Sequence, residues 1–98
     1  MYIIRDIFKL RYGTYKDAKK ILEEGLQKGL LPETKSSRVL TDFTGDAYRL
    51  IFEVGYESLA DYEHMLNSSM QKPEWKAWYS QFKGFVESSH REILKEVI

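Results

Sequence analysis

The sequence contains no cysteine, and this single absence removes several kinds of chemistry. Without thiols the chain can form no disulfide, no cysteine nucleophile and no metal site with cysteine ligands. Chains free of disulfides are the rule in the reducing cytoplasm, so we expect a cytoplasmic protein. The two histidines lack the spacing of a paired metal site, so we expect neither a metal nor another cofactor.

The sequence is also short of long apolar runs and of net charge. No apolar stretch approaches the ~20 residues of a membrane-spanning helix, and residues 1–6 become charged too early for a signal peptide. The 15 Lys and Arg residues balance the 15 Asp and Glu residues, whereas nucleic-acid-binding domains usually carry a basic excess. We therefore expect neither a membrane nor a nucleic acid as a partner.

What the chain does contain is a regular order of hydrophobic periodicities. Apolar and polar residues alternate, as they do in strands, over residues 2–11, 36–43, 48–56 and 87–98. Apolar residues recur at helical spacing over residues 15–28, 58–70 and 73–85. The length suits one domain, 1–98. The order β-α-β-β-α-β, with the second helical part split in two, predicts an α+β, ferredoxin-like βαββαβ fold with an antiparallel four-stranded sheet.

Two kinds of signal mark the ends of the first helix. Thr14 followed by Asp17 predicts a capping box at its start, and Gly29 followed by Pro32 predicts its end. Gly25 and Gly29 also form a GxxxG pair, which can mark a close contact between two helices. The favoured interpretation is that Gly25 packs on the sheet while Gly29 caps the helix.

Turn and cap residues also divide the second half of the chain. Gly45-Asp46 predicts a two-residue hairpin turn between the second and third strands. Ser58 predicts the N-cap of the next helix, with Asp61 as its partner. Pro73 suits the first turn of the helix after that. The helix that starts at Ser58 is expected to lay one apolar stripe on the sheet, made of Leu59, Tyr62, Leu66 and Met70.

The two faces of the predicted sheet differ in what covers them. In the third strand, one face is assigned to the helices and carries Tyr48, Leu50, Phe52, Val54 and Tyr56. The opposite face of the sheet is bare, and the apolar residues expected on it are Ile3, Ile7, Leu40, Ile51 and Ile93. A patch of this size is unusual on a monomer. We therefore expect a homodimer in which two open sheet faces meet.

Several charged residues interrupt these apolar faces. Asp6 lies between Ile4 and Phe8, either as an acid in a pocket or, as we favour, as the partner of an arginine on a neighbouring strand. Four more charged residues are expected to line up on the bare face, namely Arg5, Arg49, Glu53 and Arg91. They either bind an anionic ligand or, in the favoured interpretation, form ion pairs across the dimer interface.

Three segments carry a resemblance to a known family. They read SLADYE at residues 58–63, PEWKAW at 73–78 and FVESSHREIL at 85–94. In these segments, and in its whole order of elements, the chain resembles the dimeric α/β-barrel superfamily and, within it, the NIPSNAP-like proteins. The resemblance implies a homodimer whose two sheets form a barrel.

The same superfamily includes monooxygenases that act on polyketides and enzymes that degrade haem. The haem-degrading members carry an Asn, a Trp and a helical His in a pocket between helices and sheet. In this chain His64 and Asn67 share one helix and both precede Trp75 and Trp78. Because this order departs from the family pattern, the resemblance does not imply haem degradation here.

The aromatic residues of the last helix suggest where a ligand would bind. Trp75, Trp78 and Tyr79, together with Tyr56, are expected to line a pocket for a hydrophobic small molecule. The favoured alternative is that these rings only fill the core, because rings at helical spacing usually do so. For proton transfer the best base is His90, since imidazole exchanges protons near neutral pH, with Asp6 or Tyr56 to orient it.

Two functions from different classes stay open. The first is a small homodimeric protein without catalysis, either structural or a binding module for a small molecule. The second is a cofactor-independent monooxygenase or isomerase acting on a hydrophobic, aromatic substrate. The first is preferred, because no acid–base pair or nucleophile can be identified from the sequence.

Overall fold

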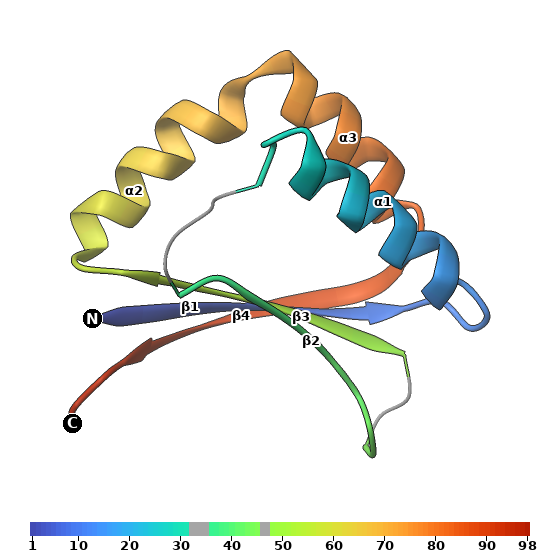
Figure 1. Ribbon diagram of the computed structural model, residues 1–98, viewed down its shortest axis with the longest axis horizontal. Coiled ribbons are helices and arrows are strands. Elements are labelled where there is room, and N and C mark those ends of the chain that lie inside the picture. Colours follow the sequence, from blue (N-terminus) through green and yellow to red (C-terminus); the bar gives the residue numbers. More distant parts are fainter. Residues whose placement is uncertain (32–35, 46–47) are drawn as a thin grey trace.

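The computed structural model describes residues 1–31, 36–45 and 48–98. In chain order its elements are β1 (Tyr2–Leu10), α1 (Tyr15–Gln27), β2 (Arg38–Thr41), β3 (Arg49–Tyr56), α2 (Leu59–Ser68), the 3₁₀ turn η1 (Ser69–Gln71), α3 (Pro73–Lys83) and β4 (Val86–Lys95). The helices all lie on one side of the sheet (Figure 1). Pro32 and Asp46, which entered the predicted helix end and hairpin turn, lie outside the described residues.

The four strands form one sheet in the order β2-β3-β1-β4. All three neighbouring pairs are antiparallel, so the predicted α+β, ferredoxin-like arrangement is confirmed. All four strands are shorter than the alternation suggested, the first and third by a single residue and the other two by more. The second covers Arg38–Thr41 rather than residues 36–43, and the last ends at Lys95 because β1, its partner, starts opposite that residue at Tyr2.

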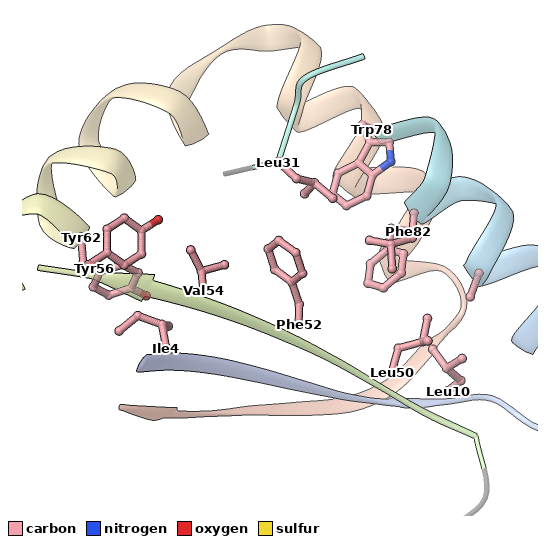
Figure 2. Packing of buried hydrophobic residues seen from close by; sticks show 12 residues of the cluster. Ile4, Leu10, Leu31, Leu50, Phe52, Val54, Tyr56, Tyr62, Trp78 and Phe82 are labelled. Atoms are coloured by element: carbon pink, nitrogen blue, oxygen red, sulfur yellow. The ribbon is translucent and has the colours of Figure 1, made fainter. Parts of the chain in front are cut away.

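The face of β3 assigned to the helices is buried, as predicted. Leu50, Phe52, Val54 and Tyr56 all belong to the hydrophobic core, and Tyr48 packs against it. Figure 2 shows the buried side chains rising from the sheet toward α1 and α3. Each large apolar side chain buried in this way contributes about 1.5–3 kcal/mol, so this face supplies most of the stabilisation.

The start of α1 does not form the predicted capping box. Thr14 has φ −101° and ψ 4°, and its side chain makes no cap hydrogen bond to the helix. Its Oγ1 instead donates to the carbonyl oxygen of Arg11 at 2.7 Å. A capping side chain needs extended backbone to reach the free amides of the first turn, and Thr14 lacks that conformation.

The end of α1 follows the prediction. Gly29 has φ +68°, a value that favours glycine. Its N–H donates to Leu26 O at 3.1 Å, and the N–H of Leu30 donates to Gly25 O at 2.9 Å. These two bonds are the pair that defines a Schellman motif, which satisfies carbonyls that the helix itself leaves free.

The ends predicted for the later helices are also found, but the stripe of α2 is only partly buried. Ser58 Oγ accepts a hydrogen bond from the Asp61 N–H at 3.1 Å, and Pro73 opens α3. Of the expected stripe only Tyr62 is buried, while Leu59 remains 45% exposed. The helix rises away from the sheet toward η1 (Figure 1), so little of its length rests on the strands.

The helix-free side of the sheet, called the open face below, follows from the strand register because directly opposed residues share a face. It includes Ile3, Arg5, Ile7, Leu40, Ile51, Glu53, His90 and Leu94. The assignment of Ile93 to this face was wrong. Ile93 pairs with Ile4 on the helix-covered face, and Leu94, opposite Ile3, takes its place.

A buried carboxylate organises the charges of the open face. Glu53 is 3% exposed and accepts from Arg5 Nη2 at 2.7 Å and from Arg38 Nη2 at 2.6 Å. The hydrogen bond from Arg38 is the main reason that the pKa of Glu53 is lowered, against the opposing effect of burial and with further help from Arg5. The predicted line of charges is thus partly wrong, because Arg91 lies on the other face.

Candidate ligand pocket

A cavity of about 200 Å³ lies between the sheet and the helices. Side chains of β1, β3 and β4 line it on the sheet side, and side chains of α1, α2 and α3 line it on the helix side. Most of its lining is apolar and comes from Ile4, Phe8, Leu22, Leu31, Phe52, Val54, Met65, Met70 and Phe82. Tyr56, Trp75, Trp78 and Tyr79, the predicted pocket residues, all line this one cavity, and Tyr62 adds a further ring.

One wall of the cavity is a stack of rings on α3. Trp75 and Tyr79 stack with centroids 4.8 Å apart, and Trp78 and Phe82 stack at 5.4 Å. Each pair is separated by four positions, which places both members on the same side of a helix. Phe8 from β1 meets Phe82 edge-on at 5.0 Å and so ties the wall to the sheet.

Trp78 is both part of the core and part of the pocket. Its side chain is buried, and its Nε1 donates to the carbonyl oxygen of Ile21 on α1 at 2.7 Å. A Cβ at Gly25 would lie only 2.6 Å from Trp78 Nε1 and Cε2. The favoured prediction for Gly25 was therefore wrong. This glycine permits a close contact between α1 and α3, rather than packing on the sheet.

Asp6 lies on the helix-covered face and borders the cavity. Arg91 Nε donates to its Oδ1 at 2.6 Å, so the favoured prediction of an arginine partner on a neighbouring strand is confirmed. The guanidinium carbon of Arg91 also lies 5.8 Å from the ring centre of Tyr62. The acid at the cavity is thus already paired with a cation and held in place by it.

His90 borders the cavity, but its side chain does not share a face with Asp6. The register pairs His90 with Ile7 on the open face and pairs Asp6 with Arg91 on the covered face. The expectation that Asp6 orients His90 is therefore wrong, because neighbouring residues of a strand point to opposite sides. His64 is exposed on α2, where the sequence placed it.

Three buried polar atoms, each on a residue that lines the cavity, have no hydrogen-bond partner among the described residues. They are Tyr56 Oη, Tyr62 Oη and Trp75 Nε1. Burial raises the pKa of the Tyr56 phenol, and the nearby Tyr62 and Asp6 raise it further. Burial likewise raises the pKa of Tyr62, although the Arg91 charge opposes it. A phenol is protonated at neutral pH even at its ordinary pKa near 10, and these shifts keep both hydroxyls in that form.

Sequence reasoning missed two members of the site, Tyr62 and Arg91. Tyr62 was recognised only as part of a helical stripe, and Arg91 was assigned to the open face. The position of Arg91 could have been predicted from Asp6, since a carboxylate on an apolar face requires a nearby cation on the same face.

The described ranges contain neither a cluster of metal-binding side chains nor a membrane-spanning helix. No three His, Asp or Glu side chains there gather closely enough to hold a metal ion. No helix in the same ranges is long and apolar enough to cross a membrane.

Solved structures with the same fold include NIPSNAP family proteins and antibiotic biosynthesis monooxygenases. A NIPSNAP family protein of unknown function from Agrobacterium tumefaciens superposes with a TM-score of 0.85 at 19% identity, covering 98% of this chain and 87% of the other. An uncharacterised NIPSNAP domain protein from Burkholderia xenovorans gives 0.84 at 15% identity, with coverage of 99% and 95%. An antibiotic biosynthesis monooxygenase gives 0.75 at 9% identity and covers both chains fully. At these identities the likeness shows a shared fold.

No protein of curated function matches the sequence at a significant level. The sequence profile of the NIPSNAP family, by contrast, matches residues 10–97. This match spans nearly the whole chain, including the three segments that first suggested the resemblance, and the chain therefore belongs to the NIPSNAP family.

Proposed function

We propose that this protein is a homodimeric binding module that holds a small hydrophobic molecule between its sheet and its helices. The observation that carries the proposal is the cavity of about 200 Å³ with its aromatic wall. An apolar cavity of ~150 Å³ is large enough to bind benzene, so the available space suits a molecule with one substituted ring. A cytoplasmic location, expected from a sequence without cysteine, is part of the proposal.

The homodimer is supported by what the open face exposes. Leu40 and Leu94 are 37% and 43% exposed on it, and its buried charge, Glu53, is already neutralised by two arginines. The chain after β2 and the chain after β4 both extend past the sheet on this side (Figure 1). They carry Phe43, Val97 and Ile98, which are almost fully exposed. A second copy packed on the open face would cover these residues.

A second candidate function is that of a cofactor-independent monooxygenase or isomerase acting on a hydrophobic aromatic substrate. Its support is the fold shared with an antibiotic biosynthesis monooxygenase and the carboxylate of Asp6 beside the cavity. Two observations favour binding instead. Asp6 is engaged by Arg91 at 2.6 Å, and the register directs His90 to the open face.

Three measurements on the purified protein test the proposal. Sedimentation velocity over a range of concentrations should show a dimer at micromolar protein, and a monomer throughout would refute the assembly. Titration with small aromatic compounds, followed by tryptophan fluorescence, should show saturable quenching. To separate binding from catalysis, aromatic compounds that bind should be recovered unchanged after incubation in air, and an oxygenated or isomerised product would favour the second candidate.

A further inference from the structure

The polar atoms of the pocket point to the chemistry of its ligand. Tyr56 and Tyr62 are 9% and 8% exposed, yet neither hydroxyl has a hydrogen-bond partner in the described part of the chain. Figure 2 shows both hydroxyl oxygens at one end of the space between α2 and the sheet, turned toward Val54 rather than outward. Buried polar groups are nearly always hydrogen-bonded in folded proteins, so these atoms are suited to meet a ligand.

Trp75 supplies the clearest chemical constraint. Its Nε1 is buried without a partner among the described residues, whereas the same atom of Trp78 is bonded to Ile21 O. An indole N–H can only donate a hydrogen bond. The group that meets Trp75 must therefore be an acceptor.

The two buried phenols can also donate a hydrogen bond to a ligand. The two phenols are protonated at neutral pH, because the ordinary pKa of a phenol is near 10 and burial raises it further, so each has a hydrogen to donate. Tyr62 is the weaker case, since Arg91 lies close to it. Asp6 Oδ1, an acceptor of a residue that lines the cavity, is already bonded to Arg91. Of the three unpartnered atoms, Trp75 Nε1 can only donate and each phenol can donate as well as accept, so an acceptor on the ligand suits all three.

The charge balance argues against an ionised ligand. The Arg91 cation is compensated by Asp6 at 2.6 Å, and the remaining lining is mostly apolar. A charged group placed there without its own counter-ion would lose its hydration and gain little in return.

We propose that the pocket selects an uncharged, ring-sized molecule that carries a carbonyl oxygen, such as a small aromatic ketone, with Trp75 Nε1 and Tyr56 Oη as the donors that recognise it. This inference rests on the proposed binding function and adds the class of ligand. Trp75 and Tyr56 are specificity residues, while the ring stack on α3 supplies affinity for any flat apolar molecule.

Two probes of equal shape test the inference. Acetophenone carries a carbonyl oxygen, and α-methylstyrene replaces that oxygen with a methylene group. One hydrogen bond is worth ~0.5–1.5 kcal/mol net, so acetophenone should bind up to roughly ten-fold more tightly. Benzoate, the charged analogue, should bind more weakly than either probe.

The two tryptophans provide an internal readout by nuclear magnetic resonance of ¹⁵N-labelled protein. On addition of acetophenone the Trp75 indole proton should move downfield, while the Trp78 proton, already bonded to Ile21 O, should stay close to its place. The Trp75→Phe variant assigns the two signals. In Trp75→Phe and Tyr56→Phe the ratio of the affinities for acetophenone and α-methylstyrene should shrink toward one, whatever the change in the absolute affinity for either probe.

The outcomes separate this inference from the proposed function. Equal affinity for acetophenone and α-methylstyrene in the natural protein would overturn the inference and leave the binding function standing. Preference for benzoate would overturn the requirement for an uncharged ligand. If none of the three probes binds up to its solubility limit, the proposed function fails, and the inference fails with it.

Discussion

The indole of Trp78 occupies the space that a side chain at position 25 would need. A Cβ at Gly25 would approach Trp78 Nε1 and Cε2 to 2.6 Å, a distance that real Cβ contacts do not reach. The same indole donates to Ile21 O, one turn earlier on α1. Gly25 and Trp78 together hold α1 against α3 and so fix the position of the aromatic wall.

Gly25→Ala should destabilise the protein, although alanine is the better helix former by ~0.5–1 kcal/mol. Displacing Trp78 resembles overpacking of a core, which typically costs 1–3 kcal/mol, so the net loss should be about 1–2 kcal/mol. Urea denaturation measures this loss. Gln27→Ala, at an exposed position of the same helix, is the control and should be neutral or slightly stabilising. In the double variant, Trp78→Phe should recover part of the stability lost in Gly25→Ala. If Gly25→Ala stabilised the protein, the contact between Gly25 and Trp78 would be contradicted.

Trp78→Ala should cost ~3–5 kcal/mol, the usual loss for a large buried ring. Trp75→Ala should cost clearly less, because Trp75 is only half-buried and loses no hydrogen bond. Denaturant midpoints of the two variants give the comparison. If Trp78→Ala fails to fold, the stability losses of Trp78→Phe and Trp75→Phe can be compared instead. Equal losses would mean that Trp78 does not anchor α3.

Glu53→Gln should reduce stability at neutral pH and remove part of its dependence on acid pH. The pKa of Glu53 is lowered in the folded state, chiefly by the hydrogen bond from Arg38. Because the pKa of Glu53 is lower in the folded state than in the unfolded state, the ionised carboxylate stabilises the folded protein. This stabilisation is complete above the unfolded-state pKa, near 4.5, and is lost as the pH falls through the folded-state pKa. The natural protein should therefore lose stability below about pH 4.5 more steeply than the variant.

We expect a loss of about 1–3 kcal/mol for Glu53→Gln at pH 7, kept modest because the side chain of Arg38 is 64% exposed. Protein concentration must be fixed, since the proposed dimerisation would shift the apparent stability. Glu23→Gln, which removes an exposed pair with Lys19, is the control and should change stability by less than ~0.5 kcal/mol. Parallel pH profiles for Glu53→Gln and the natural protein would contradict the prediction.

Ile51→Asp should shift the protein toward a monomer or make it aggregate. The register places Ile51 on the open face between Ile7 and Leu40, so an unpaired carboxylate there would be buried in the proposed interface. Sedimentation velocity at micromolar concentration measures the shift. Ser80→Asp, which adds the same charge on the exposed side of α3, should leave the oligomeric state unchanged. A natural-like dimer for Ile51→Asp would place the interface elsewhere.

The protein should bind no stoichiometric metal and should not degrade haem. His64 and Asn67 lie on α2, upstream of the aromatic wall, and His64 is exposed. Metal analysis should give well under one equivalent of zinc or iron per chain. A Soret band that shifts on haem addition and bleaches with reductant would overturn the prediction and favour an enzyme.

The element order and the covered face of β3 could be predicted from sequence because β3 alternates cleanly. Because Leu50, Phe52 and Val54 all lie on one face of β3, that face can be identified as the one that packs into the core. The faces of β4 could not be assigned in the same way. Its two sides both mix polar and apolar residues, and only pairing with β1 decides that Arg91 and Ile93 face the helices. The contact of Trp78 with Gly25 was equally inaccessible, since local spacing does not show which two helices will touch.

Four residues that line the cavity could be predicted from the sequence, but the hydrogen bonding of their polar atoms could not. Tyr56, Trp75, Trp78 and Tyr79 were chosen for their rings and helical spacing, and they do line one cavity. Which of their polar atoms are already bonded depends on neighbours that lie far apart in the sequence, such as Ile21 for Trp78. This difference separates Trp78, whose indole N–H is bonded within the protein, from Trp75, whose indole N–H has no partner among the described residues.

The place of β4 at the sheet edge beside β1 has a consequence for the order of folding. The hydrogen bond from Arg91 to Asp6 joins residues 85 positions apart, and contacts of such long sequence separation carry a large loop-closure cost and slow folding. We expect the hairpin of β2 and β3 and its pairing with β1 to form before β4 adds to the edge. Until β4 docks, the cavity lacks its floor beside Asp6, so a ligand can recognise only chains that have completed the sheet.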